Sequence, residues 1–350
     1  MALLSDLLGH AVLSGSVLAL GALGEVIAER AGVLDLGVEG LMSLGAVVAR
    51  MTLTAPPPTR VWHLAGGVGG GLVEGGGGAA LGGGGGAAYS KGPPTPHPWL
   101  GLLAAGLVGG LGAGVLALSS VVLRANQVLC GVAITFLGLG LSSVIGRSVA
   151  GIPVSAVFEP VSIPVFSSIP VIGPAFFSQN VLVYLIYLVL PGLVHFWMFR
   201  TRSGLDLRAV GENPAAADAV GVPVMQLRAL AVILGGVLAG LAGADLTLAV
   251  VPVWSDGMIA GRGWIAVALV IFAGYRPVVA VLSGLLFGLV TAVGFMGQAR
   301  GWPVAPAILN TLPYLGTVAC IIVPMLAFAK LRSAMAAPAA LGTPYYRSGR

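Results

Sequence analysis

The chain has 350 residues, of which 57% are hydrophobic and only 8% are charged, and its mean hydropathy is +1.00. A soluble domain carries about 25% charged residues, and a disordered chain combines high charge with low hydrophobicity. The composition therefore excludes a soluble enzyme and a disordered protein. Long unbroken apolar runs also argue against a transmembrane β-barrel, whose strands alternate polar and apolar residues. We expect an all-α fold, a polytopic transmembrane helical bundle of about 8–10 helices with some of them discontinuous.

Apolar stretches of about 20 residues, long enough to cross a bilayer, recur along the chain. They lie near residues 8–28, 36–54, 99–123, 127–146, 181–199, 227–251, 263–296 and 308–329. The seventh stretch is too long for one span and is interrupted by GYRP at 274–277, so we predict a short helix, a turn and a second helix there. Asp6 precedes the first run without any Lys or Arg, which indicates a retained span rather than a cleaved signal peptide.

The basic residues indicate which loops face the cytoplasm. They bracket the polar loop 200–226 and follow the last span, so both regions are predicted to be cytoplasmic. The loop 147–180 contains Arg147 as its one basic residue and is predicted to face the outside. The orientation of the first two helices stays open, because it depends on how the segment after them crosses the membrane.

Residues 54–98 differ in composition from the rest of the chain. Fourteen of the residues from 66 to 86 are glycine, and each glycine costs a helix about 1 kcal/mol relative to alanine. We interpret the segment as a Gly/Pro-rich insertion or external linker; a loosely packed extra helix is the alternative. The chain then divides into N-terminal transmembrane helices (1–53), this insertion (54–98), a transmembrane core (99–330) and a cytoplasmic C-terminal tail (331–350).

The sequence contains no motif for catalysis, for a cofactor or for a metal. The four histidines lack partners at ligand spacing, and Cys130 and Cys320 lie inside apolar runs. None of the patterns GxSxG, HExxH and GxxxxGK[ST] occurs. The net charge of +5 comes without a basic run, which gives no indication of nucleic-acid binding. We therefore expect no catalytic residue, no bound cofactor and no metal on this chain.

The longest polar stretch between helices is 203–228. Asn213 can cap a helix whose first residue is Pro214, and Gly221 can end that helix. An ordinary amphipathic loop helix would have this form. The A-A-A-x-x-x-G spacing at 215–221 also resembles the EAA loop of ABC importer permeases, although its first position is Ala215 rather than an acid.

Further segments strengthen this resemblance. Residues 24–49, 96–141, 240–277 and 312–323 are similar, in the same order, to the branched-chain amino acid and simple-sugar permease superfamily. The nearest match is its nucleoside branch, which works with basic membrane lipoproteins. Segment 54–95 departs from the pattern and looks like an insertion. The resemblance covers most of the chain.

The resemblance implies a function as the membrane-spanning permease subunit of an ATP-driven ABC importer, most similar to those for nucleosides, in a prokaryotic plasma (inner) membrane. It implies four partners: a cytoplasmic ATPase subunit that uses the ATP, a second permease subunit, an extracytoplasmic solute-binding lipoprotein and membrane lipid. Loop 200–226 would dock the ATPase. The docking residues are Arg208, Glu212, Asn213, Pro214, Ala215, Ala216, Ala217 and Gly221.

Two alternatives remain for the function. The first is an ABC permease for a simple sugar or an amino acid. The residues hardly distinguish such a permease from one for nucleosides. The second is an ion-coupled secondary transporter, which should show inverted repeats. No convincing repeat is seen in the sequence, and the docking-type loop argues against this second alternative.

Polar residues within or beside apolar spans are candidates for the solute pathway, because a charge at the centre of a span costs about 2.5–3.5 kcal/mol to insert. The candidates for the pathway or the substrate are Glu39, Asn126, Gln127, Asp245, Trp254 and Asp256. Asp245 lies within a span and should face the interior of the bundle. Trp254 and Asp256 either contact the solute or form an interfacial anchor with a surface charge.

The remaining candidates also have two interpretations each. Asn126 and Gln127 either cap a helix or form a polar pair that faces a central pore. Glu39 belongs to a charged group between two apolar runs, and the other members are Glu25, Glu29, Arg30 and Asp35. These charges either cap helix ends, with Arg30 paired to an acid, or mark a broken helix whose glycines permit irregular backbone along a cavity.

Overall fold

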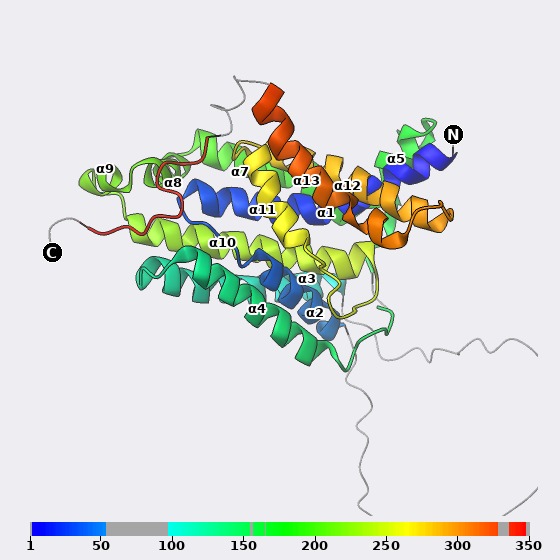
Figure 1. The fold of residues 1–350 in the computed structure, drawn as a ribbon, viewed down its shortest axis with the longest axis horizontal. Coiled ribbons are helices and arrows are strands. Elements are labelled where there is room, and N and C mark those ends of the chain that lie inside the picture. Colours follow the sequence, from blue (N-terminus) through cyan, green and yellow to red (C-terminus); the bar gives the residue numbers. More distant parts are fainter. Residues whose placement is uncertain (1, 54–96, 155–156, 165, 328–335, 348–350) are drawn as a thin grey trace, which may run out of the picture.

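The computed structural model describes residues 2–53, 97–154, 157–164, 166–327 and 336–347 (Figure 1). Almost all of the predicted insertion at 54–98 lies outside these residues. The longer helices are α1 (Ala2–Arg30), α2 (Val38–Thr52), α3 (Pro98–Ala117), α4 (Gln127–Gly146), α7 (Leu190–Arg200), α10 (Val224–Asp245), α11 (Arg262–Phe272), α12 (Pro277–Ala299) and α13 (Pro306–Ala327). They form one bundle in which α1, α4 and α10 run roughly alongside one another and α11 and α13 cross them obliquely, which confirms the predicted all-α polytopic fold.

Short elements complete the described chain. Three π-helical segments extend or join the longer helices: η1 (Leu118–Val122), η3 (Leu185–Val189) and η4 (Leu246–Val250). The other short helices are η2 (Phe166–Ser168), α5 (Ile172–Phe177), α6 (Val181–Tyr184), α8 (Arg202–Glu212) and α9 (Pro214–Ala219). Two strands, β1 (Pro160–Ser162) and β2 (Ser178–Asn180), pair antiparallel with Pro160 opposite Asn180. We call the end of the bundle that carries α8 and α9 the loop end.

Six helical segments within the described residues are long and apolar enough to cross a membrane. The predicted break in the seventh apolar stretch is confirmed: α11 ends at Phe272, and α12 begins at Pro277. Gly274 and Tyr275 both have positive φ there, and proline at the first helical position starts the next helix without losing a backbone hydrogen bond. A single uninterrupted helix is therefore impossible across this stretch.

The exposed side chains of the outer helices are apolar. On α3 and α4, Leu107, Leu111, Leu129 and Phe136 each expose more than two thirds of their surface. By contrast, α1 is almost wholly buried at the centre of the bundle. Contiguous exposed apolar faces of this kind suit contact with lipid rather than water. Helix α2 is also mostly buried, so the described residues form a bundle with an enclosed centre and an apolar exterior.

Two parts of the chain repeat one arrangement in opposite directions. In α1–α2–α3 and in α10–α11–α12, a long helix is followed by a short one and a second long one. Helix α1 runs toward the loop end and packs along α12, whereas α10 runs away from it and packs along α3 (Figure 1). The sequence showed no repeat, so this inverted arrangement is a finding of the structure. The lack of a visible repeat in the sequence is therefore no longer an argument against the secondary-transporter alternative.

Glycines allow these helices to cross in backbone contact. A Cβ on Gly109 would lie 2.2 Å from the carbonyl oxygen of Gly236, and one on Gly45 would lie 2.2 Å from that of Gly240. A Cβ on Gly288 would lie 2.1 Å from the carbonyl oxygen of Ala11. In lipid, where apolar surface drives helix association only weakly, such close approach supplies the van der Waals packing that holds helices together.

Candidate functional site

The two short helices α2 and α11 meet through one buried carboxylate. Glu39, in the first turn of α2 and only 5% exposed, accepts hydrogen bonds from the backbone N–H groups of Gly261 and Gly263, both at 2.7 Å. These N–H groups belong to the start of α11, where a helix leaves donors unsatisfied and carries a partial positive charge. A Cβ on Gly263 would lie 2.5 Å from the Glu39 backbone nitrogen. The Glu39 carboxylate of α2 therefore caps the N-terminus of α11.

An extended segment, residues 31–37, leads from α1 into α2. Its backbone is satisfied by side chains of α4: the N–H of Leu34 donates to Gln127 Oε1 at 2.8 Å, and Thr135 Oγ1 donates to the Leu36 carbonyl at 2.7 Å. Irregular backbone inside a membrane protein requires such partners, because lipid offers none. The irregular backbone of the broken-helix hypothesis is present here, but residues 25–39 do not line the cavity described below, so their place along a pathway stays a prediction.

Asn126 and Gln127 have separate roles. The side chain of Asn126 caps α4 by accepting from the N–H of Leu129 at 3.1 Å. Gln127 is buried against the extended segment. The helix-cap interpretation therefore describes Asn126, while Gln127 supports the broken helix rather than facing an open pore.

Three acids accompany the extended segment. Glu25, Glu29 and Asp35 are all buried, and each has at least one carboxyl oxygen without a hydrogen-bond partner among the described residues. Arg30 does not pair with any of them. It donates instead to the backbone carbonyls of the α11–α12 turn, at 2.9 Å to Tyr275 and 3.3 Å to Gly274. The interpretation in which Arg30 pairs with an acid is therefore wrong.

Asp245 faces the interior of the bundle, as expected. It is fully buried at the end of α10 and accepts from Ser16 Oγ of α1 at 2.5 Å. The nearby Tyr187 hydroxyl donates to the Val12 carbonyl at 3.1 Å, which gives α1 a second polar tie. These contacts hold the central helix to its neighbours.

Trp254 is a core residue. Its side chain is 2% exposed and lies against Gly146 at the end of α4, where a Cβ would come within 2.1 Å of the ring. An interfacial anchor requires a side chain at the surface of the bundle, where Trp254 does not lie, while contact of Trp254 with a solute stays a prediction. Asp256 is exposed and accepts from Ser143 Oγ at 2.5 Å.

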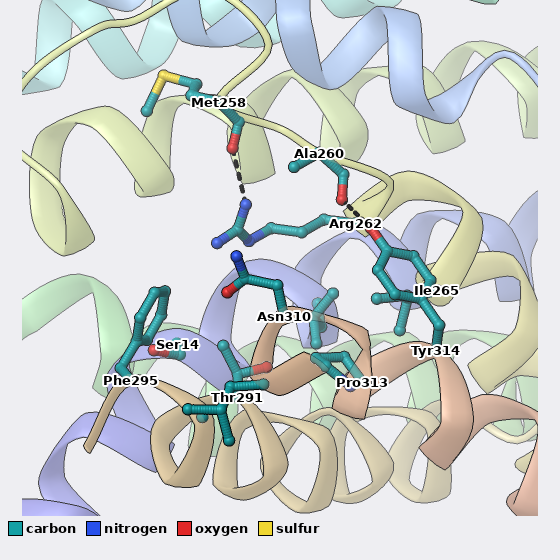
Figure 2. Close-up of a pocket in the computed structure, with 13 residues that line it drawn as sticks. Ser14, Met258, Ala260, Arg262, Ile265, Thr291, Phe295, Asn310, Pro313 and Tyr314 are labelled. Atoms are coloured by element: carbon teal, nitrogen blue, oxygen red, sulfur yellow. Dashed lines mark hydrogen bonds between the residues drawn. The ribbon is translucent and has the colours of Figure 1, made fainter. Parts of the chain in front are cut away.

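A cavity of about 360 Å³ lies beside the start of α11, between α1, α12 and α13 (Figure 2). Arg262 and Tyr314 form one wall, where Arg262 Nη1 donates to the carbonyls of Met258 and Ile259 at 2.7 and 3.0 Å, and the Tyr314 hydroxyl donates to the Ala260 carbonyl. Asn310 extends from α13 toward the guanidinium. None of the sequence candidates lines this cavity, whose residues come from α1 and from the consecutive helices α11, α12 and α13 with the loop before them.

The polar loop 200–226 folds into two helices rather than the single one expected. Thr201 caps α8 by accepting from the N–H of Gly204 at 3.2 Å. Asn213 caps α9 by accepting from the N–H of Ala216 at 3.0 Å, with Pro214 at the first helical position, as predicted. Gly221 ends the second helix with a φ of +87°, a conformation that favours glycine.

The predicted docking residues divide into an inner and an outer group. Ala217 is buried with Val210 and Val224, whereas Ala215 and Ala216 are exposed. Val220, which the sequence did not single out, is 81% exposed. Of the other candidates, Arg208 lies over the Phe199 ring at 4.8 Å, and Glu212 accepts from the N–H of Ala339 at 3.3 Å.

Helix α8 contacts the end of α1 through backbone. A Cβ on Gly211 would lie 2.1 Å from the carbonyl oxygen of Arg30, immediately before the extended segment begins. The contacts are therefore contiguous from α9 through α8 to the end of α1. They continue along the extended segment to Glu39, to the start of α11 and to the cavity.

The C-terminal residues 336–347 pack over the loop end. The N–H of Ala340 donates to the Gly211 carbonyl, and Arg228 Nη1 donates to the Thr343 carbonyl, both at 2.9 Å. Arg347 forms an ion pair with Asp218 at 2.9 Å. This segment ties α8, α9 and the start of α10 into one unit.

Comparisons with known proteins identify the family to which this chain is similar. The family model of the branched-chain amino acid transport system permease component matches residues 7–321. A protein named a putative glucose ABC transporter permease (TsgC13) from Haloferax volcanii is 36% identical over 99% of both chains. The nucleoside ABC transporter permease NupC from Lactococcus lactis subsp. cremoris is 33% identical over 85% of this chain and 84% of its own.

The guanosine ABC transporter permease NupQ of Bacillus subtilis is 30% identical, over 99% of this chain and 98% of its own. No solved structure matches the chain. The family match covers nearly all of the helical bundle, and it contains three of the segments that resembled the superfamily and all but the last two residues of the fourth, 312–323. The chain therefore belongs to the permease components of the branched-chain amino acid transport family, and it is a multi-pass ABC permease of a prokaryotic plasma membrane.

Proposed function

We propose that this chain is the membrane subunit of an ATP-driven importer for nucleosides, that it forms the solute pathway with a second permease subunit, and that it docks a separate ATPase through α9. An extracytoplasmic lipoprotein would deliver the solute. The contiguous contacts from α9 to the cavity carry this proposal, since they join an exposed cytoplasmic helix to the broken helices inside the bundle.

We infer the mechanism from the close contacts that would pass a movement of α9 to the helices inside the bundle. A displacement of α9 by the ATPase moves α8, because the two helices share a buried apolar cluster around Ala217. Helix α8 then displaces the end of α1 and the extended segment, against which Gly211 packs in backbone contact. Glu39 pulls the start of α11 with it through its two hydrogen bonds. The wall of the cavity formed by Arg262 and Tyr314 would then change shape. This change would open the cavity to one side of the membrane and close it to the other.

Nucleosides are the proposed solute because two of the three relatives are named for nucleoside or guanosine transport. Glucose is the second candidate, favoured by the 36% identical relative from Haloferax volcanii. We expect that unlabelled nucleosides compete with uptake of a labelled nucleoside into vesicles that contain the complete reconstituted transporter. Competition by glucose instead would assign the sugar, and competition by leucine alone would contradict both.

Val220, the exposed residue that follows α9, provides the test of docking. We expect Val220→Glu to lower the affinity of the permease for its ATPase by about ten-fold or more, because a charge would be buried in an apolar contact without a partner. Val220 is 81% exposed, so its replacement should leave folding intact. Pull-down of the ATPase measures the effect. Val161→Glu, an exposed residue in β1 at the opposite end, is the matched control. Unchanged ATPase binding by Val220→Glu would contradict the docking assignment.

A further inference from the structure

We propose that the cavity beside α11 binds the vicinal hydroxyl groups of a neutral polyol solute, with Arg262 and Asn310 as the two hydrogen-bond donors. This inference rests on the proposed function and names the solute-contacting residues, which the sequence did not. The volume of about 360 Å³ is within the range of about 300–1,000 Å³ that is typical of small-molecule sites.

Arg262 is held in place before any solute arrives. Its Nη1 is occupied by the Met258 and Ile259 carbonyls, and these two bonds fix the plane of the guanidinium. A guanidinium carries five N–H donors and no acceptor. The donors on Nη2 and Nε have no hydrogen bond to the described residues, and the group faces the cavity (Figure 2). A preorganised donor pair of this geometry suits two neighbouring oxygen atoms.

Asn310 places a second donor beside the first. Its Oδ1 accepts from Gln298 Nε2 at 2.9 Å, which turns the amide nitrogen away from Gln298. In Figure 2 this nitrogen points toward the guanidinium of Arg262. Two donor groups cannot satisfy each other, so an acceptor that lies between them can bind to both. Hydroxyl oxygens of a solute supply that acceptor.

The charge balance selects a neutral solute. Glu39, which caps α11, lies close enough to Arg262 for the two charges to interact. The buried Glu39 carboxylate therefore offsets part of the positive charge at the cavity, although the two side chains form no ion pair. A phosphorylated sugar or a nucleotide would bring an anion without a counter-charge, and burying it would cost several kcal/mol. A neutral hydroxylated molecule avoids this cost.

Most of the remaining lining is apolar, and Ser14 and Thr291 add two hydroxyl groups. Leu18, Ile265, Phe295, Leu309 and Pro313 line the same cavity. Apolar side chains with a few convergent polar groups are typical of sites that bury a ring and orient it by hydrogen bonds. The ribose of a nucleoside and the ring of glucose both present vicinal hydroxyls with an apolar ring face, so the site chemistry is common to both candidates.

The test uses the complete reconstituted transporter and Asn310→Ala. We expect this variant to raise the KM for uptake of a ribonucleoside by about 3- to 10-fold with little change in maximal rate, because one hydrogen bond to the solute is lost. We also expect the wild type to prefer the ribonucleoside over its 2′,3′-dideoxy counterpart, and the variant to lose most of this preference. Arg262→Gln should raise the KM further.

Control and outcomes separate the two proposals. Thr311→Ala is the matched control, since Thr311 follows Asn310 on α13, donates to the Ile308 carbonyl and does not line the cavity. Glucose and 2-deoxyglucose form a second arm, which reports a sugar site through the same loss of discrimination. If Asn310→Ala takes up the ribonucleoside with the KM of the wild type and keeps the preference over the dideoxy counterpart, the cavity assignment is overturned. The proposed function is not affected by that result. A wild type that transports neither nucleoside nor sugar overturns the proposed function and the inference together.

Discussion

Replacing Glu39 with alanine is expected to abolish uptake and to lower the melting temperature of the purified transporter. The carboxylate accepts two hydrogen bonds from the start of α11, and a bond to a charged acceptor contributes about 1.5–3 kcal/mol. Alanine leaves two buried N–H groups unpaired and removes the negative charge from the positive end of the helix. Helix α11 would then lose its link to α2, so movement of the extended segment no longer reaches the cavity.

Glu39→Gln tests the same cap more finely. Its one amide oxygen can accept from one N–H, while its NH₂ group faces the other donor, so uptake should fall between wild type and Glu39→Ala. Glu159→Ala is the control, because Glu159 is an exposed acid in the loop before β1. Uptake and thermal melting are measured on the same preparations. Glu39→Ala with wild-type uptake would show that the cap plays no part in transport.

Gly211→Ala is expected to separate ATP hydrolysis from uptake. The new Cβ would meet the Arg30 carbonyl oxygen at 2.1 Å, where both partners are backbone and neither can move aside without shifting its helix. Overpacking of this kind typically costs about 1–3 kcal/mol. The strain should move α8 away from the end of α1. ATPase activity should then persist while uptake falls at least several-fold, as measured by both assays on proteoliposomes.

Gly140→Ala is the matched control for this substitution. Gly140 lies inside α4, and an added Cβ there meets nothing within 4 Å. It should leave uptake unchanged and slightly increase stability, because alanine favours the helix and loses less conformational entropy on folding. If Gly211→Ala keeps the wild-type ratio of solute uptake to ATP hydrolysis, the result would contradict transmission of the ATPase movement through α8.

Local patterns anticipated those features that depend on short stretches of chain. The apolar stretches predicted the helices, and the GYRP interruption predicted the break between α11 and α12. The Asn-Pro pair predicted the cap and first residue of α9. Each is decided by side chains within a few residues of the backbone that they affect, which is why the sequence was sufficient.

Other features depend on residues that meet only after folding. Glu39 was a candidate because of its charge, but its partners Gly261 and Gly263 lie more than 220 positions away. Trp254 was predicted to contact the solute or to anchor the chain at the membrane interface, and it is buried because Gly146 on another helix leaves room for the ring. The residues around a glycine in an apolar run do not predict which backbone will pack against it.

The sequence by itself determined that the chain lives in a membrane, where its helices lie and which family it resembles, because burial in lipid demands long apolar segments whatever their neighbours are. Only the tertiary structure decided how those helices cross. It brought Arg262 and Asn310 together at one cavity and joined that cavity to α9 through Gly211 and Glu39. The physical reason is that lipid drives helix association only weakly, so close packing and buried hydrogen bonds between distant segments select the arrangement.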